Sequence, residues 1–182
     1  MSRLSFIDLA FFITESAASP KHVAGLSIFK KPKGSKVDWV AKFHEELQSH
    51  DQITPPFNHV IDFKSLRGPS WREVEDVDIN DHVIYHKPAK ILKEQALYDY
   101  VARLHEPLMD RSKPLWEFHI IDKVEGNRFA MYTKIHHAYA DGVTMARWMM
   151  QSMSTSPAKD TAPAIWEQHD SGGSKRNVEA QS

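Results

Sequence analysis

The sequence contains no cysteine, and it carries almost no excess charge of either sign. A chain without thiols forms no disulfide framework, no cysteine zinc site and no thiol nucleophile. Its 23 basic residues are matched by 24 acidic residues, which gives a formal net charge of -1. Because a general binder of phosphate backbones needs a basic surplus, we expect no nucleic-acid partner.

Long apolar runs are also missing. The apolar patch from Leu9 to Ile13 is bracketed by Asp8 and Glu15. It is shorter than the roughly 7–15 residues of a signal-peptide core and far shorter than the ~18 residues of a membrane span. We therefore expect a cytoplasmic chain with no spanning segment. The 182 residues, 41% of them hydrophobic, are enough for about one packed domain.

The apolar pattern predicts alternating helices and strands. Ser5 and Asp8 have the spacing of a capping box, which predicts a helix that runs to Ile13. A turn at 125–127 predicts a hairpin of strands at 115–122 and 128–137. Further strands are expected at 23–29, 60–63, 71–77 and 83–86, and helices at 37–47, 92–105 and 142–154. This is the α/β class, with helices flanking a sheet of mixed or largely antiparallel character.

Candidate chemistry is concentrated in residues 136–142, where a strand gives way to a helix. Side chains alternate along a strand, so His136 and His137 should point in opposite directions. The residues that share a face with His137 are the more apolar set, which predicts that His137 lies on the buried side. A neutral imidazole there can take a proton from a hydroxyl group. Asp141 could bond backbone N–H groups, cap the next helix or pair with an arginine, and Gly142 removes a side chain where the backbone turns or a substrate approaches.

Two simpler interpretations of the histidine pair stand beside this one. A His-His pair is often a surface accident or a hydrogen-bonded core histidine. A metal site would need a third ligand, which is not evident, and alternation turns His136 away from His137. We therefore expect no metal site.

The segment His136 to Gly142 resembles the His-His-x-x-x-Asp-Gly signature of the wax ester synthase/acyl-CoA:diacylglycerol acyltransferase family. That family belongs to the superfamily of CoA-dependent acyltransferases and condensation domains. Residues 20–26, 56–58, 108–111, 114–117 and 125–132 resemble further family segments, in the right order, between about Leu4 and Trp166. Lys21 and Ala24 depart from the family, which has methionine and glycine there.

The resemblance implies one lobe of a CoA-dependent acyltransferase-like two-lobe fold. Residues 1–156 would form the N-terminal lobe and 157–182 a largely flexible interlobe linker, apart from a short anchor at Ile165-Trp166. The C-terminal lobe, with its Asn-Asp motif, would be absent. Family members are longer and place the active site between the lobes, so we expect this chain to be inactive by itself and to need the missing lobe or a second chain.

The resemblance also implies roles for individual residues. His137 would be the general base, His136 a supporting residue, and Asp141 would maintain the loop. Gly142, Pro114, Leu115 and Trp116 would contribute to substrate binding, although Trp116 could equally be a core residue. Four methionines of the last helix favour a core role over an acyl pocket: Met145, Met149, Met150 and Met153. The basic turn of residues 30–36 has two interpretations, a solvated loop or a contact with lipid or CoA phosphate, and we favour the solvated loop.

The implied activity transfers a fatty acyl group from acyl-CoA to a long-chain alcohol or diacylglycerol, with no cofactor. Alternatives are a non-catalytic lipid-binding or partner module of the same fold, and a condensation-type domain that uses carrier-protein thioesters. An enzyme that acts on lipid substrates but has no membrane-spanning segment must bind the lipid surface from outside. The resemblance therefore implies peripheral attachment to membranes or lipid inclusions.

Overall fold

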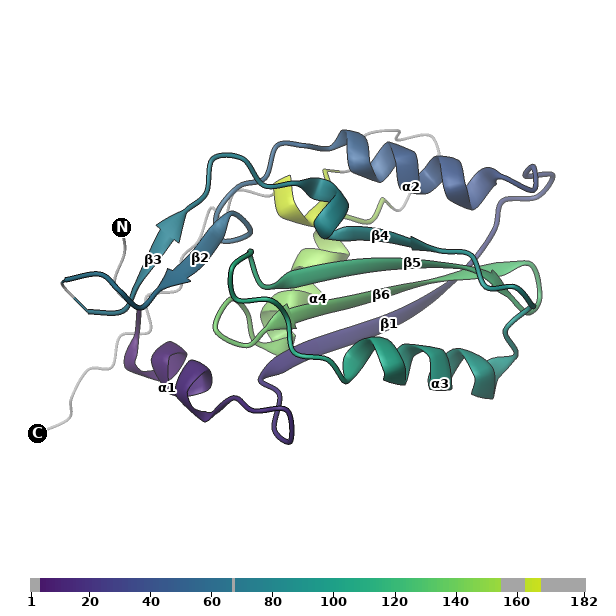
Figure 1. Cartoon of the computed structure of the whole chain (residues 1–182). Helices are drawn as coiled ribbons and strands as arrows, with labels where there is room; N and C mark the ends of the chain where they lie inside the picture. Colours follow the sequence, from purple (N-terminus) through teal and green to yellow (C-terminus); the bar gives the residue numbers. More distant parts are fainter. Residues whose placement is uncertain (1–3, 67, 155–162, 168–182) are drawn as a thin grey trace, which may run out of the picture.

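The computed structural model describes residues 4–66, 68–154 and 163–167. Its centre is a four-stranded sheet, shown in Figure 1. The strand order is β1 (His22–Lys30), β6 (Arg128–His136), β5 (Trp116–Val124) and β4 (Val83–His86). β6 is antiparallel to both β1 and β5, whereas β4 runs parallel to β5. The expected α/β lobe with a mixed sheet is therefore confirmed.

Helices cover both faces of this sheet. α3 (Glu94–His105) packs on one face, and α2 (Trp39–Ser49) and α4 (Gly142–Gln151) pack on the other (Figure 1). α1 (Phe6–Thr14) lies at the end of the sheet where β6 finishes, beside the two-stranded ribbon of β2 (His59–Asp62) and β3 (Ser70–Glu73). Short 3-10 turns occur at η1 (Ile79–Asp81) and η2 (Ile165–Glu167).

Local chemistry explains most of these boundaries. The predicted capping box is present, because Ser5 accepts the Asp8 N–H and Asp8 accepts the Ser5 N–H. The hairpin turn uses positive φ angles at Gly126 and Asn127, +80° and +55°. α3 starts two residues later than predicted, because Leu92 bonds the edge of β5 through the Lys123 carbonyl. β3 ends at Glu73 and α4 at Gln151, both earlier than their periodicity predicted.

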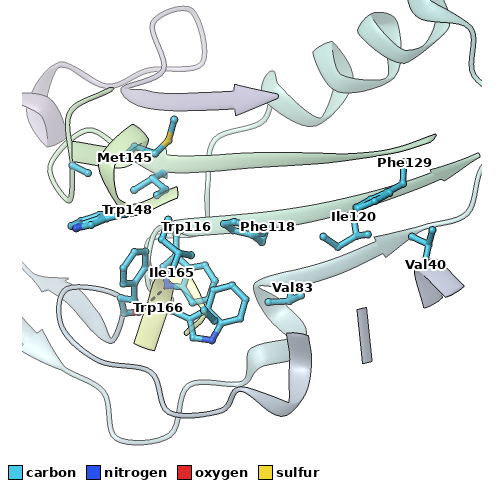
Figure 2. Close-up of a cluster of buried hydrophobic side chains, with 14 residues drawn as sticks. Val40, Val83, Trp116, Phe118, Ile120, Phe129, Met145, Trp148, Ile165 and Trp166 are labelled. Atoms are coloured by element: carbon cyan, nitrogen blue, oxygen red, sulfur yellow. Dashed lines mark hydrogen bonds between the residues drawn. The ribbon is translucent and has the colours of Figure 1, made fainter. Parts of the chain in front are cut away.

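An aromatic cluster fills the core between the sheet and α4 (Figure 2). Trp116 is 1% exposed, stacks on Trp166 with 5.3 Å between ring centroids, and donates its indole N–H to the Phe57 carbonyl. Trp116 is thus a core residue, one of the two interpretations the sequence left open. Trp166 comes from η2, so residues 163–167 pack into this lobe, as the predicted anchor requires. The proposed boundary at residue 156 and most of the predicted linker lie outside the described residues.

The methionines of α4 divide between core and surface. Met145 is buried and Met149 packs against the same cluster, which confirms the core interpretation for these two. Met150 is 75% exposed and Met153 is 43% exposed, so the interpretation was wrong for them. Met150 follows the partly buried Met149 by one position, about 100° around the helix, and so leaves the face of α4 that meets the core. Met153 lies beyond Gln151, the last residue of α4. No helix in the described part of the chain is long and apolar enough to cross a membrane.

Candidate active site

The turn that follows β6 carries the candidate site. His136 is the last residue of β6, and its carbonyl accepts the Tyr139 N–H at 2.9 Å, which closes the turn. The His137 N–H donates to the Lys21 carbonyl at 2.8 Å, just before β1 begins. Asp141 then caps α4 by accepting the Thr144 N–H at 2.8 Å. The backbone is therefore fixed on both sides of the histidine pair.

His136 lies inside the protein and is 1% exposed. Its ring stacks on Phe12 at 4.3 Å, and its Nδ1 accepts the Ala138 N–H at 3.1 Å. Its Nε2 faces the Glu15 carboxylate at 3.5 Å. Burial lowers the pKa of His136 to about 4, with the Arg111 charge acting in the same direction and Glu15 opposing it, so the ring is neutral near pH 7.

His137 is the more accessible histidine, contrary to the sequence prediction. It is partly exposed, and its ring stacks on Phe11 with 4.3 Å between centroids. The prediction that His137 lies on the buried side was wrong for two physical reasons. Both faces of the sheet are covered by helices, so an apolar face does not mark the inner one. The strand also ends at His136, so the turn, not strand alternation, sets the direction of His137.

A cavity of about 660 Å³ opens beside His137. One wall is α1 together with its cap, and the other is the turn and the start of α4. Among the described residues its lining includes Asp8, Phe11, His137, Asp141 and Thr144. No hydrogen bond within the described ranges engages the His137 ring nitrogens. The imidazole is therefore held by stacking, with its nitrogens available to a molecule in the cavity.

The other predicted substrate-binding residues lie elsewhere. Pro114, Leu115 and Trp116 are buried behind the turn. The Leu115 carbonyl accepts the His136 N–H at 2.9 Å, and the Leu115 N–H donates to the Tyr139 hydroxyl at 3.1 Å. These contacts support the turn from inside the core, and substrate contact by this segment stays a prediction.

Gly142 is the first residue of α4 and lines a separate shallow groove with Val143 and Met150. A Cβ built on Gly142 would meet no described heavy atom within 4 Å, so packing does not require glycine there. Its expected role in close substrate approach is untested and stays a prediction.

Sequence reasoning missed the supports that α1 provides. Phe11 and Phe12 are consecutive on α1, and each stacks on one of the two consecutive histidines. Glu15 and Arg111 form an ion pair at 2.9 Å behind His136. Arg111 lies in a family-like segment, but nothing in the local sequence indicates that it meets a glutamate 96 positions earlier.

The family model for the wax ester synthase/diacylglycerol acyltransferase catalytic domain matches residues 4–182. The probable diacylglycerol O-acyltransferase tgs2 of Mycobacterium tuberculosis is 35% identical over 161 residues, which cover 87% of this chain and 36% of that protein. The O-acyltransferase WSD of Acinetobacter baylyi is 35% identical over 170 residues, 91% of this chain and 35% of that protein. This chain therefore spans about a third of the length of these curated relatives.

Solved structures agree with the family match. The wax ester synthase/diacylglycerol acyltransferase of Marinobacter aquaeolei VT8 superposes with a TM-score of 0.86 at 34% identity, covering 95% of this chain and 42% of that one. A starter condensation domain of rhizomide synthetase shares the fold, with a TM-score of 0.52 at 16% identity over 82% of this chain and 35% of that one. The histidine pair in its turn, the mixed sheet and the family match lead to one conclusion: this chain belongs to the wax ester synthase/diacylglycerol acyltransferase catalytic domain family.

Proposed function

We propose that this chain is the histidine-bearing lobe of an O-acyltransferase that moves a fatty acyl group from acyl-CoA to the hydroxyl of a long-chain alcohol or diacylglycerol. The observation that carries the proposal is the placement of His137. Its imidazole is the one of the pair that reaches the cavity between α1 and α4, whereas His136 is enclosed. Acyltransferase names among the 35% identical relatives support this reaction class.

His137 acts as general base in the proposed step. A ring nitrogen takes the proton of the acceptor hydroxyl while that oxygen attacks the thioester carbonyl. The new ester C–O bond forms as the C–S bond breaks, and the departing CoA thiolate receives the proton from the imidazolium. Such a base supplies about 10²–10⁴-fold of rate, so holding two lipid substrates in line must supply much of the rest.

The remaining residues of the turn hold the base. Asp141 caps α4 and lies on the cavity wall, so it maintains the loop and does not need to transfer a proton. Phe11 holds the His137 ring by stacking. The missing two thirds of the relatives' length would close the cavity and contribute the rest of the site, either as further sequence or as a second chain. Peripheral binding to lipid surfaces follows from the substrates.

The test compares the chain alone with the chain plus a polypeptide that matches the remaining part of the relatives. Palmitoyl-CoA with hexadecanol or diacylglycerol is the substrate pair, and both CoA release and ester formation are measured. We expect ester only in the combined sample. His137→Ala should lower its rate by about 10²–10⁴-fold. Asp38→Asn, in an exposed ion pair with Lys42 on α2, is the matched control and should keep the parent rate.

Three results would count against the proposal. Full activity of His137→Ala would remove the general base from the mechanism. Equal activity of the chain without its complement would show that one lobe suffices. Ester formation from carrier-protein thioesters but not from acyl-CoA would favour a condensation-type domain.

A further inference from the structure

The Glu15 carboxylate lies where three parts of the site meet. Its Oε2 accepts hydrogen bonds from Arg111 Nη2 at 2.9 Å and Nε at 3.3 Å. Its Oε1 accepts the Lys21 N–H at 3.2 Å and lies 3.5 Å from His136 Nε2. The Glu15 side chain is 3% exposed, so these interactions are screened little by water. Glu15 follows α1, outside the signature that carries the two histidines.

Arg111 fixes this carboxylate in place. Its Nη2 also donates to the Phe12 carbonyl at 2.8 Å, and its guanidinium lies 5.4 Å from the centroid of the Phe12 ring. Phe12 in turn stacks on His136. Burial raises the pKa of Glu15, but the hydrogen bonds from Arg111 and the Lys21 N–H outweigh it and lower that pKa overall, so Glu15 is ionised near neutral pH.

The geometry assigns a single tautomer to His136. Nδ1 accepts the Ala138 N–H, so it must carry a lone pair. In a neutral imidazole the proton is then on Nε2, the nitrogen that faces the Glu15 carboxylate. That nitrogen has no hydrogen-bond acceptor among the described residues, so the negative charge of Glu15, 3.5 Å away, is what stabilises the proton at that end of the ring. The opposite tautomer would set an N–H at Nδ1 against the N–H of Ala138.

This tautomer matters because the Ala138 N–H belongs to the turn that presents His137. A second chain of contacts also connects Glu15 with His137. The Lys21 N–H donates to Glu15, and the Lys21 carbonyl accepts the N–H of His137. The contact with the His136 ring and the contact with the Lys21 N–H both involve the same atom, Glu15 Oε1.

We propose that Glu15, fixed by Arg111, is a positioning residue of the transferase: together with the Ala138 N–H it favours the Nε2–H tautomer of His136, and it holds the backbone of His137 through Lys21. This inference rests on the proposed function only for its effect on rate. Its effect on His136 is a property of the folded chain and is measured separately.

The test uses Glu15→Gln, which keeps the size of the side chain but removes the charge. It also replaces one of the two acceptor oxygens by an NH2 group, so either Arg111 or the Lys21 N–H loses its acceptor. Histidine labelled with ¹⁵N reports the tautomer of each ring by NMR, and His136→Asn assigns the His136 signals. We expect the parent His136 to show the Nε2–H pattern and Glu15→Gln to show a mixture of tautomers. In the combined active sample we expect kcat to fall by about 10–100-fold with little change in KM, because a small displacement of the general base slows the chemical step.

The matched control is Glu73→Gln. Glu73 also faces a histidine, with 3.7 Å between its Oε1 and His59 Nε2, but its side chain is 66% exposed. It should leave both the His136 signals and kcat at their parent values. Should Glu15→Gln keep the Nε2–H pattern, or keep the parent kcat, the inference is overturned. An unchanged rate in His137→Ala would instead defeat the proposed function while leaving the tautomer result valid.

Discussion

Trp166 provides a quantitative test of how far the lobe extends along the chain. Its indole ring is 1% exposed, stacks on Trp116 and meets the Phe118 ring edge-on at 5.5 Å (Figure 2). Its Nε1–H donates to the His50 carbonyl at 2.7 Å. If residues 163–167 were only a tether between lobes, removing this ring would cost little stability.

Two substitutions separate the ring from its hydrogen bond. Trp166→Ala deletes a fully buried aromatic side chain, which costs about 3–5 kcal/mol in a protein core. Trp166→Phe keeps most of the stacking area but removes the N–H donor, which costs about 1–2 kcal/mol once the unpaired His50 carbonyl is included. Because whole domains have only about 5–15 kcal/mol of stability, the alanine variant should be close to unfolded under mild denaturation.

The assay is urea unfolding followed by far-UV circular dichroism, with the free energy of unfolding extrapolated to water. Met150→Ala, on the exposed side of α4, is the control and should change that free energy by less than about 0.5 kcal/mol. A loss below about 1 kcal/mol for Trp166→Ala would refute the reasoning and return residues 163–167 to the linker. If Trp166→Ala cannot be purified in folded form, a measurable decrease in the free energy of unfolding of Trp166→Phe still tests the prediction.

Two further predictions concern stability. Burial lowers the pKa of His22, His86 and His136 to about 4 in the folded chain, whereas the pKa of a histidine in the unfolded chain is about 6.5. Between those values the unfolded chain binds more protons, so the free energy of unfolding should fall as pH falls, by at most about 1.4 kcal/mol per pH unit for each histidine. Urea titrations at several pH values check this, and stability that rises on acidification would contradict it. Asp141→Ala should cost about 1 kcal/mol through loss of the α4 cap, whereas Asp141→Asn, which caps equally well, should cost little; equal losses in thermal melts would argue against the cap.

Most of the secondary structure followed from local sequence. The capping box at Ser5, the hairpin turn at Gly126 and the strand at 83–86 are all encoded within a few residues, and all are present. The predicted ends of helices and strands were wrong where contacts with distant residues set them. Leu92 bonds β5 instead of starting α3, and the periodicity of α4 continues beyond the point where the helix ends.

The site itself divides in the same way. The histidine pair, Asp141 and the family resemblance are local patterns, and the comparisons confirm the family. The orientation of the pair is not local. It depends on the end of β6, on the covering of both sheet faces and on the two phenylalanines of α1, which lie more than a hundred positions away in the sequence.

Local sequence patterns were therefore enough to predict the element types, the fold class and the family, because helix periodicity, turn chemistry and short motifs depend on neighbouring residues. The exposure of His137 to the cavity and the enclosure of His136 against Phe12 and Glu15 came instead from contacts between distant segments of the folded chain. Packing and burial act between residues far apart in the chain, so they set the environment of each histidine only after the chain has folded.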